Sequence, residues 1–215
     1  MPQIFPKWSN TAAKLVPIII VIKLVVIVFV FWYWFSPLNL EVGYRPKQPL
    51  PFSHKLHVSD LQIDCLYCHS NAEKSSFGSV PSTQTCLNCH EHQANKDSLN
   101  FAPALQSWRN DTPIPWIRVH KLGDYAYFDH SAHIKVGVGC ISCHGNIDQM
   151  QVVKQEKPLS MGWCLECHRN PAPHLRPSHE VTNMEFHQSE AYKQMAIEKA
   201  KNLHPPIENC SGCHR

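Results

Sequence analysis

The sequence predicts a mainly α-helical chain with extensive loops and one N-terminal transmembrane helix. Three observations predict it. An apolar run of 21 residues fills positions 15–35. The chain has 17 prolines against 8 glycines, and few long apolar periodicities follow the apolar run, which together favour short helices and extended connectors over sheet. Finally, all ten cysteines fall inside five Cys-x-x-Cys-His units.

The apolar run at 15–35 has the length of a membrane-spanning helix. Twenty-one helical residues extend about 32 Å, which matches the hydrocarbon core of a bilayer. The run ends in an aromatic cluster typical of a membrane interface, made of Phe29, Phe31, Trp32, Tyr33, Trp34 and Phe35. A cleaved signal peptide is the alternative, but no small-residue cleavage site follows. The sequence therefore favours an uncleaved anchor.

The Cys-x-x-Cys-His unit has a geometry that suits one covalently attached haem. Its two thiols reach the two vinyl groups of a porphyrin, and the adjacent imidazole reaches the iron. Five units predict five haem c groups. The predicted thioether residues are Cys65, Cys68, Cys86, Cys89, Cys140, Cys143, Cys164, Cys167, Cys210 and Cys213. The predicted proximal iron ligands are His69, His90, His144, His168 and His214.

Other uses of paired cysteines fit the pattern less well. All-cysteine zinc sites need two pairs each, and five pairs leave a remainder, although mixed sites of two Cys and two His stay open. A disulfide framework does not explain why His follows every second Cys. A thioredoxin-like dithiol needs a βαβ pattern nearby, and this sequence has none.

The haems are expected to form the core of the part outside the membrane. About 180 residues follow the anchor, so each haem has roughly 35 residues around it, too few for a separate apolar core. One longer helix is expected over residues 189–202, with Ser189 as its cap, Tyr192, Met195, Ile197 and Ala200 loosely on one side, and Pro205 and Pro206 after it.

A repeat with a shift of about 76 residues identifies candidate distal ligands. Phe52-Ser-His54-Lys-Leu-His57 precedes the first unit, and Phe128-Asp-His130-Ser-Ala-His133 precedes the third. The i, i+3 spacing puts each histidine pair on one helical face, where it can reach two haems. Two modules of about 50–125 and 126–215 are expected, with the fifth haem appended. His54, His57, His130 and His133 are therefore predicted distal ligands.

Two residues compete for the fifth distal position. His120 is one, and Met161 is the other, whose thioether would raise the potential of its haem. Ordinary packing is the alternative role for Met161. The remaining histidines lie in polar surroundings that favour surface positions: His92, His174, His179, His187 and His204.

Taken together, these stretches resemble the pentahaem cytochrome c subunit of bacterial alternative complex III. The resemblance is carried by PFSHKLH at 51–57, IPWIRVH at 114–120, YFDHSAHIKVGVGCISCHG at 127–145, SMGWCLECHRNP at 160–171 and the terminal CSGCHR. The modules are also similar to class III multihaem cytochromes c, which use the same FxHxxH pairs. The fold class expected is one transmembrane helix plus a class III-like multihaem domain.

The resemblance implies an electron-transfer relay subunit rather than a stand-alone catalyst. In that family, electrons from quinol oxidation pass to a periplasmic cytochrome c or an oxidase. The implied partners are an iron-sulfur subunit, multi-helix quinol-binding membrane subunits and a monohaem cytochrome c. Two rival functions are a membrane-anchored multihaem dehydrogenase that oxidises quinol itself and feeds a periplasmic reductase, and a terminal reductase like pentahaem nitrite reductase.

Haem attachment of this type also sets the expected topology. It is bacterial export chemistry, so residues 1–14 are expected in the cytoplasm, 15–35 in the inner membrane, and 36–215 in the periplasm. The formal charge of +3 is offset by about −10 from ten haem propionates, with about +5 returned by ferric iron. No nucleic-acid partner is therefore expected.

Overall fold

A computed structural model describes residues 4–35, 41–91, 100–203 and 208–214 of the 215-residue chain. Contacts divide the chain into two units, 1–40 and 41–215. The first holds helix α1 (Trp8–Phe35). The second holds the other helices and the loops that join them. In the described residues there is no named strand, and only an isolated bridge joins Val138 to Leu175.

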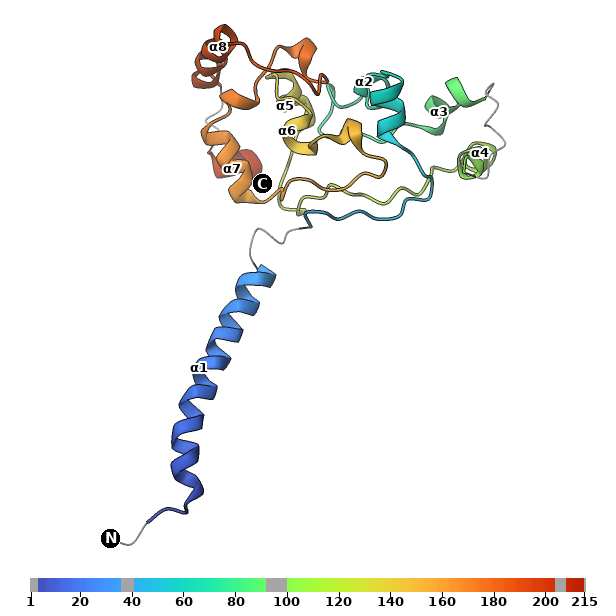
Figure 1. Ribbon diagram of the computed structural model, residues 1–215. Coiled ribbons are helices and arrows are strands. Elements are labelled where there is room, and N and C mark those ends of the chain that lie inside the picture. The colour runs from blue at the N-terminus through green and yellow to red at the C-terminus, as the bar shows by residue number, and fades with distance from the viewer. Residues whose placement is uncertain (1–3, 36–40, 92–99, 204–207, 215) are drawn as a thin grey trace. The chain divides into compact units, whose positions relative to one another are not determined.

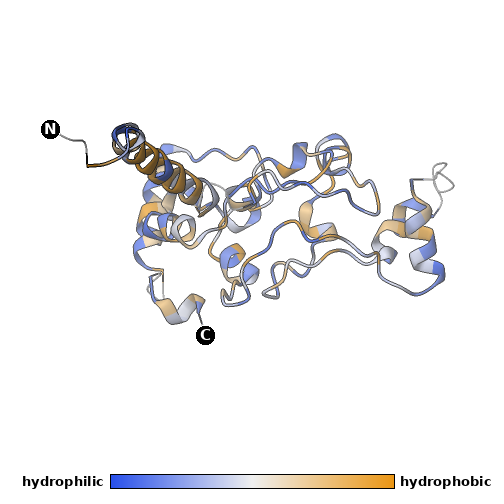
Figure 2. Cartoon of the chain, turned by 90° about the horizontal axis from the view of Figure 1, so that it is seen from below, coloured by the Kyte–Doolittle hydropathy of each residue, from blue (hydrophilic) through white to orange (hydrophobic). Residues whose placement is uncertain are grey.

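Helix α1 contains the whole predicted apolar run and begins seven residues before it. Its 28 residues extend about 42 Å, and Figure 2 shows apolar colouring along its length. None of its residues is buried against other parts of the chain. In length and composition it is the one helix of the described residues that could cross a membrane.

The second unit consists of short helices joined by long loops (Figure 1). Its α-helices are α2 (Cys65–Cys68), α3 (Thr83–His90), α4 (Ala102–Arg109), α5 (His130–Lys135), α6 (Ile141–His144), α7 (Met161–Arg169), α8 (Glu190–Lys201) and α9 (Cys210–Cys213). It also has a π-helical turn, η2 (Lys55–Asp60), and the 3-10 turns η3 (Ile147–Gln149), η4 (Ala172–His174) and η5 (Ser178–Glu180).

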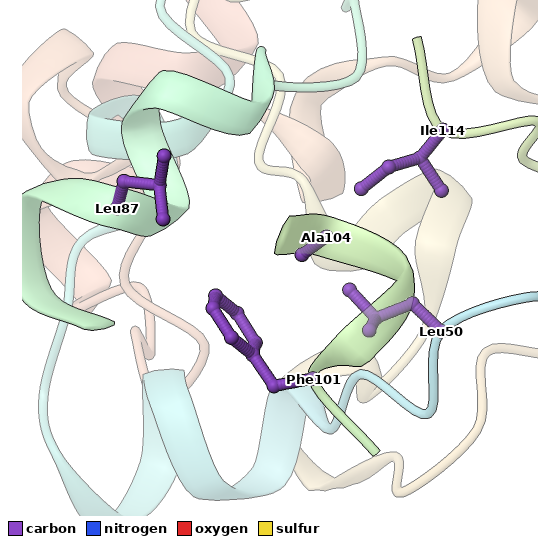
Figure 3. Packing of buried hydrophobic residues seen from close by; sticks show 5 residues of the cluster. All are labelled: Leu50, Leu87, Phe101, Ala104 and Ile114. Carbon is purple, nitrogen blue, oxygen red and sulfur yellow. The ribbon is translucent and has the colours of Figure 1, made fainter. Parts of the chain in front are cut away.

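The polypeptide itself forms two small apolar clusters in this unit. One joins α3 and α4 to the loops before and after them (Figure 3) and contains Leu50, Leu87, Phe101, Ala104 and Ile114. The other contains Ala172, Leu175 and Ala196. A conventional domain of about 175 residues buries far more apolar side chains than this. The scarcity agrees with the expectation that prosthetic groups supply the core.

Helix α8 confirms the predicted helix and corrects its packing face. The Ser189 hydroxyl accepts a hydrogen bond from the Tyr192 backbone N–H at 3.2 Å, which caps the first turn. Ala196 is 1% exposed, whereas Met195 is 64% and Ile197 42% exposed. The buried side is therefore the i, i+4, i+8 row that begins at Tyr192. The helix ends at Lys201, before Pro205 and Pro206, which lie outside the described residues.

Candidate haem-binding site

Each of the five Cys-x-x-Cys-His units lies on or beside a short helix. The units sit at α2, α3, α6, α7 and α9. One helical turn places residues i and i+3 on the same face, so both thiols of a unit can face one planar group. Asp64, Ser160 and Asn209 cap three of these helices by accepting hydrogen bonds from backbone N–H groups. These caps stabilise helices of four to nine residues, lengths that are marginal alone.

The thiols of these units lie partly buried in several cases, and burial controls their chemistry. Burial raises the pKa of Cys143 to about 12, with the nearby Cys167 and Cys164 thiols adding to the effect. A hydrogen bond with Cys140, together with burial, raises the pKa of Cys65. These thiols are therefore protonated at neutral pH in the polypeptide.

The repeated FxHxxH segments have nearly the same geometry in both modules. The Phe52 ring lies 4.9 Å from His54 at 88° and 4.4 Å from His57 at 26°, measured between ring centroids and planes. Phe128 lies 4.7 Å from His130 at 88° and 4.5 Å from His133 at 29°. The phenylalanine thus holds both imidazoles of its segment. The match is notable because the first segment forms a π-helical turn and the second an α-helix.

The second histidine of each segment faces the histidine of a Cys-x-x-Cys-His unit. The His57 and His90 ring centroids are 6.2 Å apart at 46°. Those of His133 and His168 are 6.1 Å apart at 41°. Two imidazoles on opposite sides of one metal, each bonded at about 2 Å, have centroids roughly 6 Å apart. Both pairs therefore have the spacing of bis-histidine ligation.

Hydrogen bonds to backbone carbonyls select the same ring nitrogen in five histidines. Nδ1 lies 2.7 to 3.0 Å from a carbonyl oxygen in His57, His69, His130, His133 and His214. Because a carbonyl only accepts, Nδ1 must carry the proton, which leaves Nε2 with a lone pair. A metal-bound histidine is commonly oriented in this way. His57 and His133 are the second histidines of the FxHxxH segments, and His130 is a first histidine. His69 and His214 belong to Cys-x-x-Cys-His units.

A group of imidazoles surrounds His144, the histidine of the third Cys-x-x-Cys-His unit. His120 lies 4.4 Å away with its ring nearly perpendicular, and His130 lies 6.5 Å away with its ring tilted by 14°. Only the His130 separation leaves room for a metal between the rings. Burial lowers the pKa of His144 to about 3 and that of His54 to about 4, with neighbouring imidazoles adding to both shifts. Both rings are thus neutral at pH 7, the form that binds iron.

Buried polar atoms without partners mark further positions in this group. Nε2 of His120 and Nδ1 of His54, His90 and His144 are buried and make no hydrogen bond. Such atoms are costly unless something else satisfies them. The residues present therefore suit an iron-bound prosthetic group, which would use these nitrogens or reorient the rings that carry them.

The remaining predicted site residues have less distinctive surroundings. Met161 begins α7 and is 61% exposed. His54 is influenced electrostatically by His69 first among its neighbours. Of the histidines expected at the surface, His179 and His187 are exposed, whereas His174 is half-buried and lies 3.2 Å from the Ser142 hydroxyl. His92 and His204 lie outside the described residues.

Three residues beside the site were not predicted from the sequence. Phe101 stacks on His90 at 4.6 Å, and Tyr125 stacks on His214 at 6.0 Å. Tyr125 is 89 residues from His214 in the chain, and Phe101 follows the helix of His90 outside any motif, so no local pattern indicated either contact. Arg176 is 6% exposed, and its guanidinium lies over the Phe186 ring at 5.1 Å. A Cβ on Gly139 would lie 2.2 Å from the Arg176 Cζ, so this cation lies against the backbone beside Cys140.

Bare-metal sites find no support in the arrangement. No three His, Cys, Asp or Glu side chains converge as they would around a single ion in the part of the chain that the structure describes. The facing histidine pairs instead leave room for a metal at the centre of a planar group between the two rings. The donor set of paired thiols and facing imidazoles fits haem c.

Comparison with known proteins agrees with this chemistry. No family model matches the chain. The chain is similar to a protein of Nitratidesulfovibrio vulgaris (strain Hildenborough) described as the multiheme cytochrome c subunit of menaquinone reductase. The two are 29% identical over 176 residues, which cover 79% of this chain and 77% of the relative. The mainly helical architecture with one N-terminal apolar helix confirms the predicted fold class, and the similar protein is itself described as a multihaem cytochrome c.

Proposed function

We propose that this chain is the electron-relay subunit of a membrane quinol:electron-acceptor oxidoreductase and carries five haem c groups. The observation that carries the proposal is the pair of matched histidine contacts, His57 with His90 and His133 with His168, at 6.2 and 6.1 Å. Each joins an FxHxxH segment to a Cys-x-x-Cys-His unit. Haem supplies one-electron chemistry, and the polypeptide sets spacing, ligands and burial.

In this proposal the ten cysteines form thioethers and the unit histidines are proximal ligands. His54, His57, His130 and His133 are distal ligands, and His120 and Met161 compete for the fifth distal position. An iron with two protein ligands has no open position for substrate. The chain therefore transfers electrons without binding the molecule that is oxidised or reduced. The modules at about 50–125 and 126–215 each contribute one FxHxxH segment.

Helix α1 serves as a single-pass anchor in the proposal. Its residues include neither His nor Cys, so it offers none of the ligand types that the site uses. We place residues 1–14 in the cytoplasm, the anchor in the bacterial inner membrane and residues 36–215 in the periplasm. The reason is that haem is attached to such units after export. The anchor holds the haem domain beside the membrane that contains the quinone pool.

The partners proposed are those of alternative complex III: an iron-sulfur subunit, multi-helix quinol-binding membrane subunits and a monohaem cytochrome c. The relative in N. vulgaris is described as a subunit of a menaquinone reductase, which supports a multi-subunit, quinone-linked complex. A chain without an open iron position depends on another subunit for the quinone chemistry.

The same relative favours a second candidate, in which electrons flow in the opposite direction. A menaquinone reductase takes electrons from a donor and delivers them to the quinone. The relay residues derived above would serve either direction, because outer-sphere transfer is reversible and its direction follows the potentials of the two partners.

Purification from native membranes tests the proposal. Mass spectrometry of the chain should show five haem adducts and no free thiol, and other subunits should co-purify. In the intact complex, quinol should reduce the haems, and an oxidised periplasmic cytochrome should reoxidise them. If instead a reduced donor reduces the haems and menaquinone reoxidises them, the second candidate is correct. A chain that purifies alone and oxidises quinol alone would refute the relay function.

A further inference from the structure

The contacts between the five haem-binding units define their order in space. The second and first units are neighbours: the Asn88 side-chain amide donates a hydrogen bond to the Tyr67 hydroxyl at 3.2 Å. Each of these residues lies between the two cysteines of its unit. Burial and the nearby Cys89 thiol raise the pKa of Cys68, which brings a cysteine of each unit close together.

The first and third units are also neighbours. Cys65 and Cys140, the leading cysteines of these units, lie close enough that each thiol shifts the pKa of the other, upward for Cys65 and downward for Cys140. A single segment contacts both units, because the Thr182 hydroxyl donates to the Asp64 carboxylate at 2.7 Å and Cys140 N–H donates to the Val181 carbonyl at 3.0 Å.

The two modules exchange contacts at this point, which fixes the first and third units together. The His130 and Ser131 N–H groups donate to the carbonyls of Ser76 and Ser75, in the loop after the first unit. Reciprocally, Lys55 N–H donates to the Met150 carbonyl at 3.1 Å, in the loop after the third unit.

The third, fourth and fifth units continue the series. The Ser142 hydroxyl of the third unit lies 3.2 Å from Nδ1 of His174, just after the fourth unit. Arg169, next to His168 of the fourth unit, forms an ion pair at 2.6 Å with Glu208, just before the fifth. Burial and the nearby Cys213 thiol raise the pKa of Cys164.

Exposure distinguishes the two ends of this series from its middle. Cys89 of the second unit and Cys210 and Cys213 of the fifth are exposed, whereas the other seven cysteines are partly buried. Within residues 41–215, Figure 1 shows the helices of these motifs in the same order. Helix α3 lies at one end, followed by α2 and α6, and α7 lies at the other end beside the C-terminus.

We propose that the haems form one row in the order second, first, third, fourth, fifth, and that electrons enter and leave through the second and fifth haems. The inference rests on the proposed function, because it takes each unit to hold one haem. It implies that partner proteins dock beside α3 and α9. The first, third and fourth haems then relay electrons between these ends and need no contact with a partner.

The test is to locate the five irons in the full-length chain within its native complex, by cryo-electron microscopy or anomalous diffraction. Each iron is assigned to its unit through the density of its thioether bonds. The expected result is an unbranched row in the stated order, with the partners that exchange electrons lying against α3 and α9. Five irons in the order of the sequence, or a branched arrangement, would refute the inference and leave the relay function standing. Fewer than five haems would refute both.

A second measurement uses a variant that removes an end. Cys210→Ala/Cys213→Ala should leave four irons whose mutual distances are unchanged, with altered redox interaction only at the fourth haem. Cys65→Ala/Cys68→Ala should instead separate the second haem from the other three. If loss of the fifth haem changes the interactions of the second as strongly as those of the fourth, the proposed order is wrong.

Discussion

Removing one distal histidine should convert one haem in five from low spin to high spin. In His133→Ala, the iron held by His168 loses the ring whose centroid lies 6.1 Å away. A five-coordinate ferric haem is then expected, because His133 supplies the second axial ligand in the proposed site. Alanine keeps the propensity of α5 for helix, so the loss of the ligand is separated from loss of the helix.

The structure also sets the size of the effect. His133 stacks on Phe128 at 4.5 Å and bonds the Asp129 carbonyl at 2.7 Å, so the polypeptide loses about 2 kcal/mol of stability from these contacts. The low-spin ferric signal in electron paramagnetic resonance should fall by one fifth. His57→Ala should do the same, since its geometry is nearly identical, and the double variant should lose two fifths.

Added imidazole provides the decisive comparison. It should occupy the space left by the deleted ring and restore the low-spin signal of either single variant. The matched control is His179→Ala, whose side chain is 80% exposed, and it should lose nothing. A full low-spin signal in His133→Ala, or a loss in His179→Ala equal to that in His133→Ala, would refute the assignment of the distal ligands.

Four further outcomes are expected. Arg176→Met should lower the midpoint potential of the third haem by an amount on the order of 50 mV, because a buried cation stabilises the reduced, more negative state. Arg176→Lys should keep most of the original potential. Equal midpoint potentials in redox titrations of the parent protein and both variants would contradict the effect. Gly137→Ala should cost about 3 kcal/mol in denaturant unfolding, since φ is +91° and the new Cβ would lie 2.2 Å from the Arg176 carbonyl oxygen, whereas Gly212→Ala, with nothing within 4 Å, should be neutral. Met161→His should lower one haem potential if Met161 is the fifth distal ligand, and no change in any potential would exclude it. Replacing residues 1–40 by a cleavable export signal should release the haem-loaded domain into the soluble periplasmic fraction, and retention in washed membranes would show a second attachment.

The features that the sequence predicted are those coded by short local patterns. The apolar run, the five haem-binding units and the capped helix after Ser189 each depend on neighbouring residues, and the structure contains helices at each of these places. The FxHxxH repeat indicated histidines that reach a Cys-x-x-Cys-His unit, and His57 and His133 lie near His90 and His168. Their role as distal ligands stays a prediction.

The features that escaped prediction depend on distant contacts. The buried face of α8 includes Ala196 instead of Met195, because η4 and Leu175 pack on the small residues. The stacking of Tyr125 on His214 and the packing of Arg176 against the backbone at Gly139 likewise join segments far apart in sequence. The order of the haem-binding units could not be predicted either, since the first unit lies between the second and third in space and precedes both in the chain.

The small apolar clusters described above have a consequence for biogenesis. A polypeptide with so few buried side chains gains little free energy from collapse alone, so each covalent attachment must act as a step of folding. In the proposed function, a chain without its haems would then remain a good substrate for proteases until they are attached. Because Cys210 and Cys213 supply one end of the proposed row, a chain without this unit would lack one terminal haem of the relay and would remain recognisable for degradation.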